Sequence, residues 1–218
     1  MPQLPIRHPS TVLIAGPTGS GKTQFLAQLL TTKYCIVPSP DRIIWVYGEW
    51  QAAYDELTAR LGSRILFTKD CDTEQIYESL DPQVRNLLVL DDQMGSDAVG
   101  QGSGSSIAKF FTQGSHHRNL TVVYIVQNLF NKDRVMRTVS LNSHYIFLFK
   151  NPRDNSQIRT FASQMFPNNS RFLVDAFRDA TSESYGYLLA DCHKDTPEVL
   201  RARTNVMSKT PVVYVPLK

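Results

Sequence analysis

Residues 16–23, Gly-Pro-Thr-Gly-Ser-Gly-Lys-Thr, combine residue types and spacing that could bind phosphate groups. They match the pattern GxxxxGK[ST] in full. The apolar run 11–15 before them predicts a short buried strand, and residues 24–30 after them predict a helix with one apolar face. The candidate binding residues are therefore Gly16, Pro17, Thr18, Gly19, Ser20, Gly21, Lys22 and Thr23.

A strand-to-helix turn of this composition suits the triphosphate of a nucleotide. Its glycines allow the backbone to curl so that successive N–H groups point at phosphate oxygens. The helix that follows adds its positive N-terminal end. Lys22 would pair with the β and γ phosphates, and the Thr23 hydroxyl would bind Mg²⁺. The alternative is a glycine-rich turn with no ligand; the register of Lys22 and Thr23 favours ATP and Mg²⁺.

A second candidate feature is acidic: Asp91 and Asp92 directly follow the apolar run 86–90. A continuous apolar run of this kind predicts a central parallel strand buried on both faces. Parallel sheets present their ligands at the carboxyl ends of the strands. Asp91 would hold Mg²⁺, directly or through water, and Asp92 would orient and deprotonate the attacking water. The alternative is a pair of acids that cap the end of a strand.

Gln127 directly follows another apolar run, residues 121–126. If that strand lies beside the Asp91 strand, the Gln127 amide can reach the γ-phosphate or the attacking water. We therefore predict a sensor role, in which one hydrogen bond reports hydrolysis to the protein. A glutamine that merely caps the strand is the alternative.

Hydrolysis also requires positive charge on the γ-phosphoryl group in the transition state, which an arginine finger can supply. The candidates flank the Gln127 strand: Arg118 before it, and Arg134 and Arg137 after it. Arg118 and Arg137 complete the predicted catalytic set of Lys22, Asp91, Asp92 and Gln127. A finger supplied in trans would require an oligomer. For each arginine the alternative is a solvated loop charge or a contact to a DNA phosphate.

The remaining pattern predicts an α/β fold with a mostly parallel central sheet flanked by helices and a strand pair at the C-terminus. Residues 1–10 are expected to form an arm, and residues 11–218 a single domain. The expected strands are 11–15, 42–47, 64–67, 86–90, 121–126, 145–149, 185–190 and 200–206. The expected helices are 24–30, 50–61, 73–80, 107–113, 157–165 and 171–180.

The overall composition is that of an ordinary globular protein. Of its 218 residues 42% are hydrophobic and 20% are charged, and the net charge of +3 permits contact with nucleic acid without establishing it. Three cysteines without a CxxC pair argue against a disulfide framework or a zinc site and favour a reducing compartment. His116 and His117 are adjacent and make a poor metal pair. No apolar run approaches the length of a membrane span, so we expect a soluble protein of cytosol or nucleus.

Several segments together resemble the HerA/FtsK superfamily of P-loop ATPases, of the RecA/ASCE type. The resemblance is greatest to the poxvirus-like genome-packaging ATPases of large DNA viruses, virophages and Polinton/Maverick or adintovirus elements. The phosphate loop and the Asp91 strand would be its Walker A and Walker B motifs, which many ATPases share. The Ser-His-His run before the Gln127 strand is more specific. The resembling segments are GPTGSGKT at 16–23, LLVLDDQM at 87–94, FTQGSHHRNLTVVYIVQNLF at 111–130, RTVSLNSHYIFLFKNPRD at 137–154 and YGYLLAD at 185–191.

The resemblance implies an ATP-driven translocase that pumps double-stranded DNA into a preformed capsid. It implies a homo-oligomeric ring of five or six subunits, capsid vertex proteins as partners, no membrane contact, and a place in the host nucleus, cytoplasm or virion during viral assembly. It also implies that the Asp91 strand lies beside the Gln127 strand. Many members carry Glu at position 92, so Asp92 leaves the identity of the base open. DNA would be contacted through its phosphates, with the Gly/Ser-rich segment 95–106 as one candidate loop and a plain surface loop as the alternative.

Three other functions share parts of this pattern. A cellular or plasmid-type DNA pump or helicase would use the same catalytic residues with other partners. A GTPase switch fits the DxxG string at 92–95, but the Asn-Lys-Asp run 131–133 has its Asp one place too early for guanine recognition. A protein that uses ATP only to assemble would not need Asp91, Asp92 and Gln127 together.

Overall fold

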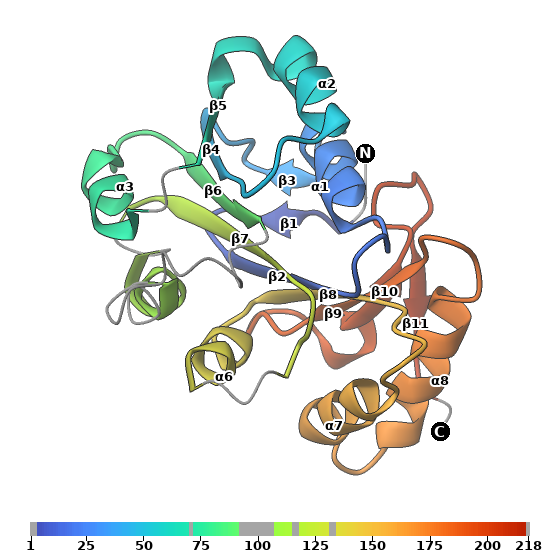
Figure 1. Ribbon diagram of the computed structural model, residues 1–218. Coiled ribbons are helices and arrows are strands. Elements are labelled where there is room, and N and C mark those ends of the chain that lie inside the picture. Colours follow the sequence, from blue (N-terminus) through green and yellow to red (C-terminus); the bar gives the residue numbers. More distant parts are fainter. Residues whose placement is uncertain (1–3, 70–71, 92–106, 115–117, 131–133, 217–218) are drawn as a thin grey trace.

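The computed structural model describes residues 4–69, 72–91, 107–114, 118–130 and 134–216. Their central element is a mixed sheet of nine strands (Figure 1). Six neighbouring strands, from β8 to β5, are parallel, and the last three pair antiparallel. The order across the sheet is β11 (Val212–Tyr214), β10 (Ala202–Thr204), β9 (Tyr187–Asp191), β8 (Tyr145–Phe149), β2 (Thr11–Ala15), β7 (Leu120–Val126), β6 (Asn86–Asp91), β4 (Arg42–Val46) and β5 (Ile65–Thr68).

The central strands form because their side chains are apolar on both faces. Every residue of β2, β6, β7 and β8 is buried. Such strands are stable only when both faces of the sheet are covered by helices. This confirms the predicted α/β class and the mostly parallel sheet, with three antiparallel C-terminal strands where a pair was expected.

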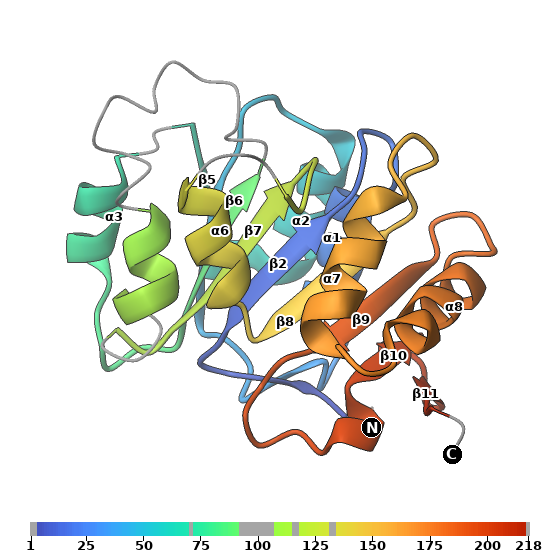
Figure 2. The same ribbon diagram turned by 90° about the horizontal axis from the view of Figure 1, so that it is seen from below.

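Helices cover the two faces unequally (Figure 1). One face packs against α1 (Lys22–Thr31) and α2 (Ala52–Leu61), through Phe25, Leu26, Tyr54 and Leu57 among others. In Figure 2, α6 and α7 cross in front of the opposite face. The elements that pack on that second face are α3 (Thr73–Ser79), the π-helical turn η2 (Phe110–Gly114), α6 (Arg134–Leu141), α7 (Ser156–Met165) and α8 (Ser170–Ala180).

The parallel strands place three predicted site elements at one edge. β2 lies between β7 and β8, and β7 also pairs with β6. The Asp91 strand therefore lies beside the Gln127 strand, as the family resemblance implied. In register, Asp91 pairs with Ile125 and Ala15 pairs with Val126. The phosphate loop, Asp91 and Gln127 consequently emerge together at the carboxyl ends of adjacent strands.

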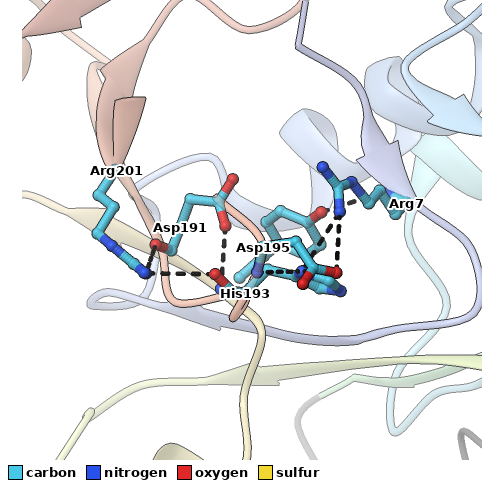
Figure 3. Close-up of polar contacts among 6 residues, drawn as sticks. Arg7, Asp191, His193, Asp195 and Arg201 are labelled. Atoms are coloured by element: carbon cyan, nitrogen blue, oxygen red, sulfur yellow. Dashed lines mark hydrogen bonds and ion pairs between the residues drawn. The ribbon is translucent and has the colours of Figure 1, made fainter. Parts of the chain in front are cut away.

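The segment before β2 packs onto the rest of the chain. Its short strand β1 (Ile6–Arg7) pairs in parallel with β3 (Ile36–Val37), forming a separate two-stranded sheet. Arg7 lies 3.5 Å from Asp195 across a half-exposed ion pair, which contributes little by itself. Figure 3 shows this contact beside a second set, in which Arg201 donates to the carbonyls of Asp191 and His193. The N-terminal segment is thus fixed at the side of the molecule where β9 ends.

Several boundaries differ from the prediction. The helix expected over 50–61 begins at Ala52, and residues 107–109 are α-helical before the chain widens into the π-helical turn at Phe110. The strand expected over 185–190 begins only at Tyr187, because Tyr185 has a φ of 63° and cannot continue an extended strand. The strand expected over 200–206 is confined to β10.

A buried histidine makes stability depend on pH. The His8 ring is buried; in its neutral form Nε2–H donates to Asn119 Oδ1 at 3.0 Å and Nδ1 accepts from the Thr121 hydroxyl at 2.7 Å. Burial lowers the pKa of His8, against the smaller raising effect of the Asn119 hydrogen bond. Below about pH 6.5 the unfolded chain therefore binds a proton at this ring that the folded protein does not.

We expect the free energy of unfolding to fall as pH drops below about 6.5, by up to about 1.4 kcal/mol per pH unit from this residue. When the free energy of unfolding is measured with denaturant at several pH values, it should fall less steeply with decreasing pH for the His8→Gln variant than for the wild type between pH 6.5 and pH 5. Above pH 7.5 the ring is neutral in both states, so the two slopes should agree there. Equal slopes over the acidic range would contradict the assignment.

Candidate nucleotide-binding site

The phosphate loop has the curled backbone that its glycines predict. Gly19 and Gly21 have φ values of 78° and 90°, a region that other residues rarely occupy. Gly21 is also the N-cap of α1, and no side chain caps the helix there. The N–H groups of the first helical turn therefore have no capping side chain, and the positive end of the helix is left for an anion.

Gly16 is required because the loop passes close to β8 at this residue, and not because of its φ value. A Cβ atom at this position would lie 2.6 Å from Phe149 Cβ, at the end of β8. Such a distance is far below van der Waals contact, so a larger residue would force β8 or the loop to move. The first glycine of the motif thus permits the loop to pack against the neighbouring strand.

Lys22 curls back over the loop that precedes it. Its side chain is 9% exposed, and its ammonium donates to the carbonyls of Gly16 at 2.7 Å and Pro17 at 2.9 Å. These contacts hold a positive charge within the curl of the loop. A phosphate seated on the loop would lie against this charge, which suits the role predicted for Lys22.

Thr23 and Asp91 meet at the centre of the site. The Thr23 hydroxyl donates to Asp91 Oδ2 at 3.2 Å, and the buried Tyr54 hydroxyl donates to the same oxygen at 3.0 Å. Two hard oxygen donors from α1 and β6 are therefore adjacent. This is the donor chemistry that Mg²⁺ prefers, so these two residues would fit a magnesium ion, which would supply positive charge beside a bound phosphate.

A cavity of about 370 Å³ joins these groups to Gln127. Gln127 follows the last residue of β7, and its neighbouring loop is fixed because the Leu129 N–H donates to Gln157 Oε1 at 2.8 Å. The cavity walls come from the phosphate loop, the start of α1, the start of α2 and the ends of β6 and β7. They comprise Thr18, Gly19, Gly21, Lys22, Thr23, Gln24, Gln51, Ala53, Asp91, Ile125, Val126 and Gln127.

The arginine candidates do not reach this cavity within the chain. Arg118 precedes β7, at the end of the sheet opposite Gln127. Its guanidinium lies 4.8 Å from the centre of the Tyr77 ring and donates to the Leu80 carbonyl at 3.4 Å. Arg134 and Arg137 are exposed on α6, one turn apart, so the loop position weighed as an alternative for them does not apply.

The other predicted positions fall outside the described residues. They are Asp92, the segment 95–106, His116 and His117, and the run 131–133. Their predicted roles stay predictions.

Helix α2 also contributes to the site, and the sequence did not indicate this. Gln51 and Ala53 line the cavity, and Tyr54 holds Asp91. Tyr54 also packs on Trp45, with ring centres 5.3 Å apart. The helical pattern at 50–61 was visible, but no local signal shows that its first turn reaches Asp91 at the end of β6.

No family model and no curated protein sequence matches the chain. Solved structures do match. The genome-packaging NTPase B204 from Sulfolobus turreted icosahedral virus 2, in complex with AMP, is 13% identical with a TM-score of 0.55, covering 96% of this chain and 98% of that one. The DNA-packaging ATPase B204 from Sulfolobus turreted icosahedral virus is 12% identical, with a TM-score of 0.52 and the same two shares.

A third matching structure is not described as a packaging protein. The KaiC-like protein PH0186 from Pyrococcus horikoshii OT3 is 15% identical with a TM-score of 0.50, covering 95% of this chain and 90% of that one. The chain has the fold of a P-loop NTPase. At these identities the likeness concerns the P-loop fold, and the function has to be argued from the site. Among the described helices of this P-loop chain, none combines the length and apolar character needed to cross a bilayer.

Proposed function

We propose that this protein is an ATPase that drives DNA translocation for viral genome packaging. The observation that carries the proposal is the convergence of Lys22, Thr23, Asp91 and Gln127 on one cavity. The loop supplies phosphate binding, the two oxygen donors supply a metal site, and an amide stands opposite them. Lys22 and Thr23 come from the loop and the start of α1, Asp91 comes from β6 and Gln127 follows β7, so their meeting is a property of the fold and not of one local motif.

We propose the following division of work among these groups and Asp92, which lies outside the described residues. Backbone N–H groups of the loop and the Lys22 ammonium bind and neutralise the β and γ phosphates of ATP. Thr23 and Asp91 would hold Mg²⁺, which when bound neutralises charge on the same phosphates. Gln127 orients the attacking water or senses the γ-phosphate. Asp92, which directly follows Asp91, takes the proton of that water.

The packaging role rests on different support. Two structural neighbours are described as a genome-packaging NTPase and a DNA-packaging ATPase, and the sequence segments resemble the poxvirus-like branch of the HerA/FtsK superfamily. We infer a homo-oligomeric ring that contacts double-stranded DNA through its phosphates and docks on capsid vertex proteins. Within that ring, the site that lacks an arginine from its own described residues would receive Arg137, Arg134 or Arg118 from a neighbour.

The experiment that tests this function is ATP hydrolysis with and without linear double-stranded DNA, at two salt concentrations. A packaging motor should show DNA-stimulated turnover that weakens as salt increases, because phosphate contacts release counterions. A rate of ATP hydrolysis that does not change when DNA is added would favour a protein that uses ATP to assemble. If DNA alone has no effect and the rate of hydrolysis rises only when procapsids are added, the protein is a motor that becomes active only after it binds the capsid.

Tyr54 provides a sharper test of the metal site. In the Tyr54→Phe variant the ring still packs on Trp45, but Asp91 Oδ2 loses the hydrogen bond from the tyrosine hydroxyl and keeps only the one from Thr23. Removing such a support for a metal ligand typically weakens metal binding about 10- to 100-fold. We expect the Mg²⁺ concentration for half-maximal hydrolysis to rise within that range, with little change in thermal unfolding. An unchanged Mg²⁺ requirement would show that Tyr54 only fills space.

A further inference from the structure

A second cavity of about 360 Å³ lies on the other side of the phosphate loop. It shares Gly19 with the first cavity. Its remaining walls come from the loop, from the turn after β8 and from the connection between α8 and β9. They comprise Ser20, Phe149, Lys150, Pro152, Ser182, Glu183, Ser184, Tyr185 and Gly186.

Among the residues that line this cavity, Tyr185 is an exposed aromatic residue. Its side chain is 73% exposed, which is unusual for a large aromatic residue. A Cβ atom on Gly21 would lie 2.8 Å from Tyr185 Cδ1, so the ring rests against the phosphate loop itself. An exposed aromatic face therefore stands within reach of anything bound to the loop.

The turn that presents Tyr185 is held in place on both sides. Tyr185 has a positive φ of 63°, which costs free energy for a residue with a side chain. The next residue must be glycine, because a Cβ atom on Gly186 would lie 2.5 Å from the Ala180 carbonyl. Tyr187 then packs on Phe25 of α1, with ring centres 4.5 Å apart. The helix that carries Lys22 and Thr23 thus also anchors the turn.

The direction of a bound triphosphate follows from the first cavity. Thr23 and Asp91 lie on one side of the loop, so the γ-phosphate end must face them. The nucleoside end must leave the loop on the opposite side, where the second cavity lies.

We propose that the second cavity is the subsite for the base and ribose of the nucleotide, with the base stacked on Tyr185. This rests on the proposed nucleotide-binding function and deepens it. Stacking uses the π face that every base shares, so Tyr185 supplies affinity with little base selectivity. Ser182, Glu183 and Ser184 place hydroxyl and carboxylate groups beside the stacked ring, where they suit the ribose hydroxyls.

The test compares two ligands that share the triphosphate and differ in the base. One is a non-hydrolysable ATP analogue with an imido β–γ bridge, and the other is inorganic tripolyphosphate, both with Mg²⁺. Calorimetry on Tyr185→Ala should show the analogue binding about 5- to 150-fold more weakly, the range for loss of one stacked base. Tripolyphosphate should bind Tyr185→Ala and wild type within about twofold.

A matched control is available in Tyr34. It is also an exposed tyrosine, at 52%, with a positive φ of 66°, but it lies beyond the far end of α1. Tyr34→Ala should bind both ligands as the wild type does. Tyr185→Phe should keep the affinity for the ATP analogue, since it keeps the ring.

A second readout does not depend on the alanine variant folding well. In Tyr185→Trp, the ATP analogue should change the added tryptophan fluorescence, measured against the wild type, and tripolyphosphate should not. Equal losses for both ligands, or no loss for either, would overturn the base subsite while leaving the loop intact. If the wild type bound neither ligand, the proposed nucleotide function would fail first, and the subsite with it.

Discussion

Replacing Lys22 with alanine is expected to weaken ATP binding by at least about 100-fold, to the point where calorimetry detects none. The reason lies in the position of its ammonium, which is buried in the curl of the loop and bound to two loop carbonyls. Alanine removes the charge that faces the phosphates and leaves those carbonyls without their donor. The bound nucleotide would then meet unpaired carbonyl oxygens in place of a cation.

The control for this change is Lys33→Ala. Lys33 is an exposed lysine shortly after the far end of α1, so its removal lowers the net charge equally without touching the loop. It should bind ATP as the wild type does. An Lys22→Ala variant that is folded by circular dichroism and binds ATP within threefold of the wild type would remove Lys22 from phosphate binding.

Asp91→Asn is expected to lower kcat/KM for ATP hydrolysis by about 100- to 10,000-fold. Asparagine keeps the shape of the side chain and can still accept the hydrogen bonds from Thr23 and Tyr54. The carboxylate charge that would hold Mg²⁺ is lost, so the phosphates lose the stabilisation that the metal provides. Raising the Mg²⁺ concentration should recover part of the activity, because the weakened step is metal binding.

Two further variants make the result specific. Asp55→Asn changes an exposed carboxylate on α2 and should hydrolyse ATP as the wild type does. Asp92→Asn should bind ATP and Mg²⁺ normally but lose turnover, which added Mg²⁺ should not restore, because its predicted role is proton transfer. Unchanged turnover in Asp92→Asn would remove Asp92 from the base role, and unchanged turnover in Asp91→Asn would remove the proposed metal site.

Much of this site could be predicted because its parts are encoded locally. The loop needs glycine where φ is positive, and a lysine and a threonine in fixed register, which a motif records directly. The strands that end in Asp91 and Gln127 are continuous apolar runs, and such runs indicate burial without any knowledge of the fold. Their adjacency came from the family resemblance, since the sequence between them does not state which strands pair.

The parts that escaped prediction depend on tertiary contacts. The strands β1 and β3 have two residues each, too few for any periodic pattern. Helix α6 was not predicted, although Met136 and Val139 give it a buried face. Tyr185 was assigned to a strand, whereas its positive φ and the lack of room for a Cβ atom at Gly186 place a turn there. None of these features is determined by the residues next to it in sequence.

The position of β2 has a consequence for how the chain is made. The phosphate loop at residues 16–23 is synthesised well before the strands on either side of β2, which begin only at Leu120 and Tyr145. A nascent chain that stops before Leu120 carries every residue of the motif and neither of the strands that hold it. Since sequence-distant pairing is slow and leaves apolar strands uncovered, the early half must wait for the late half during biosynthesis. Nucleotide binding is therefore a property that the growing chain acquires only after β7 and β8 have been made.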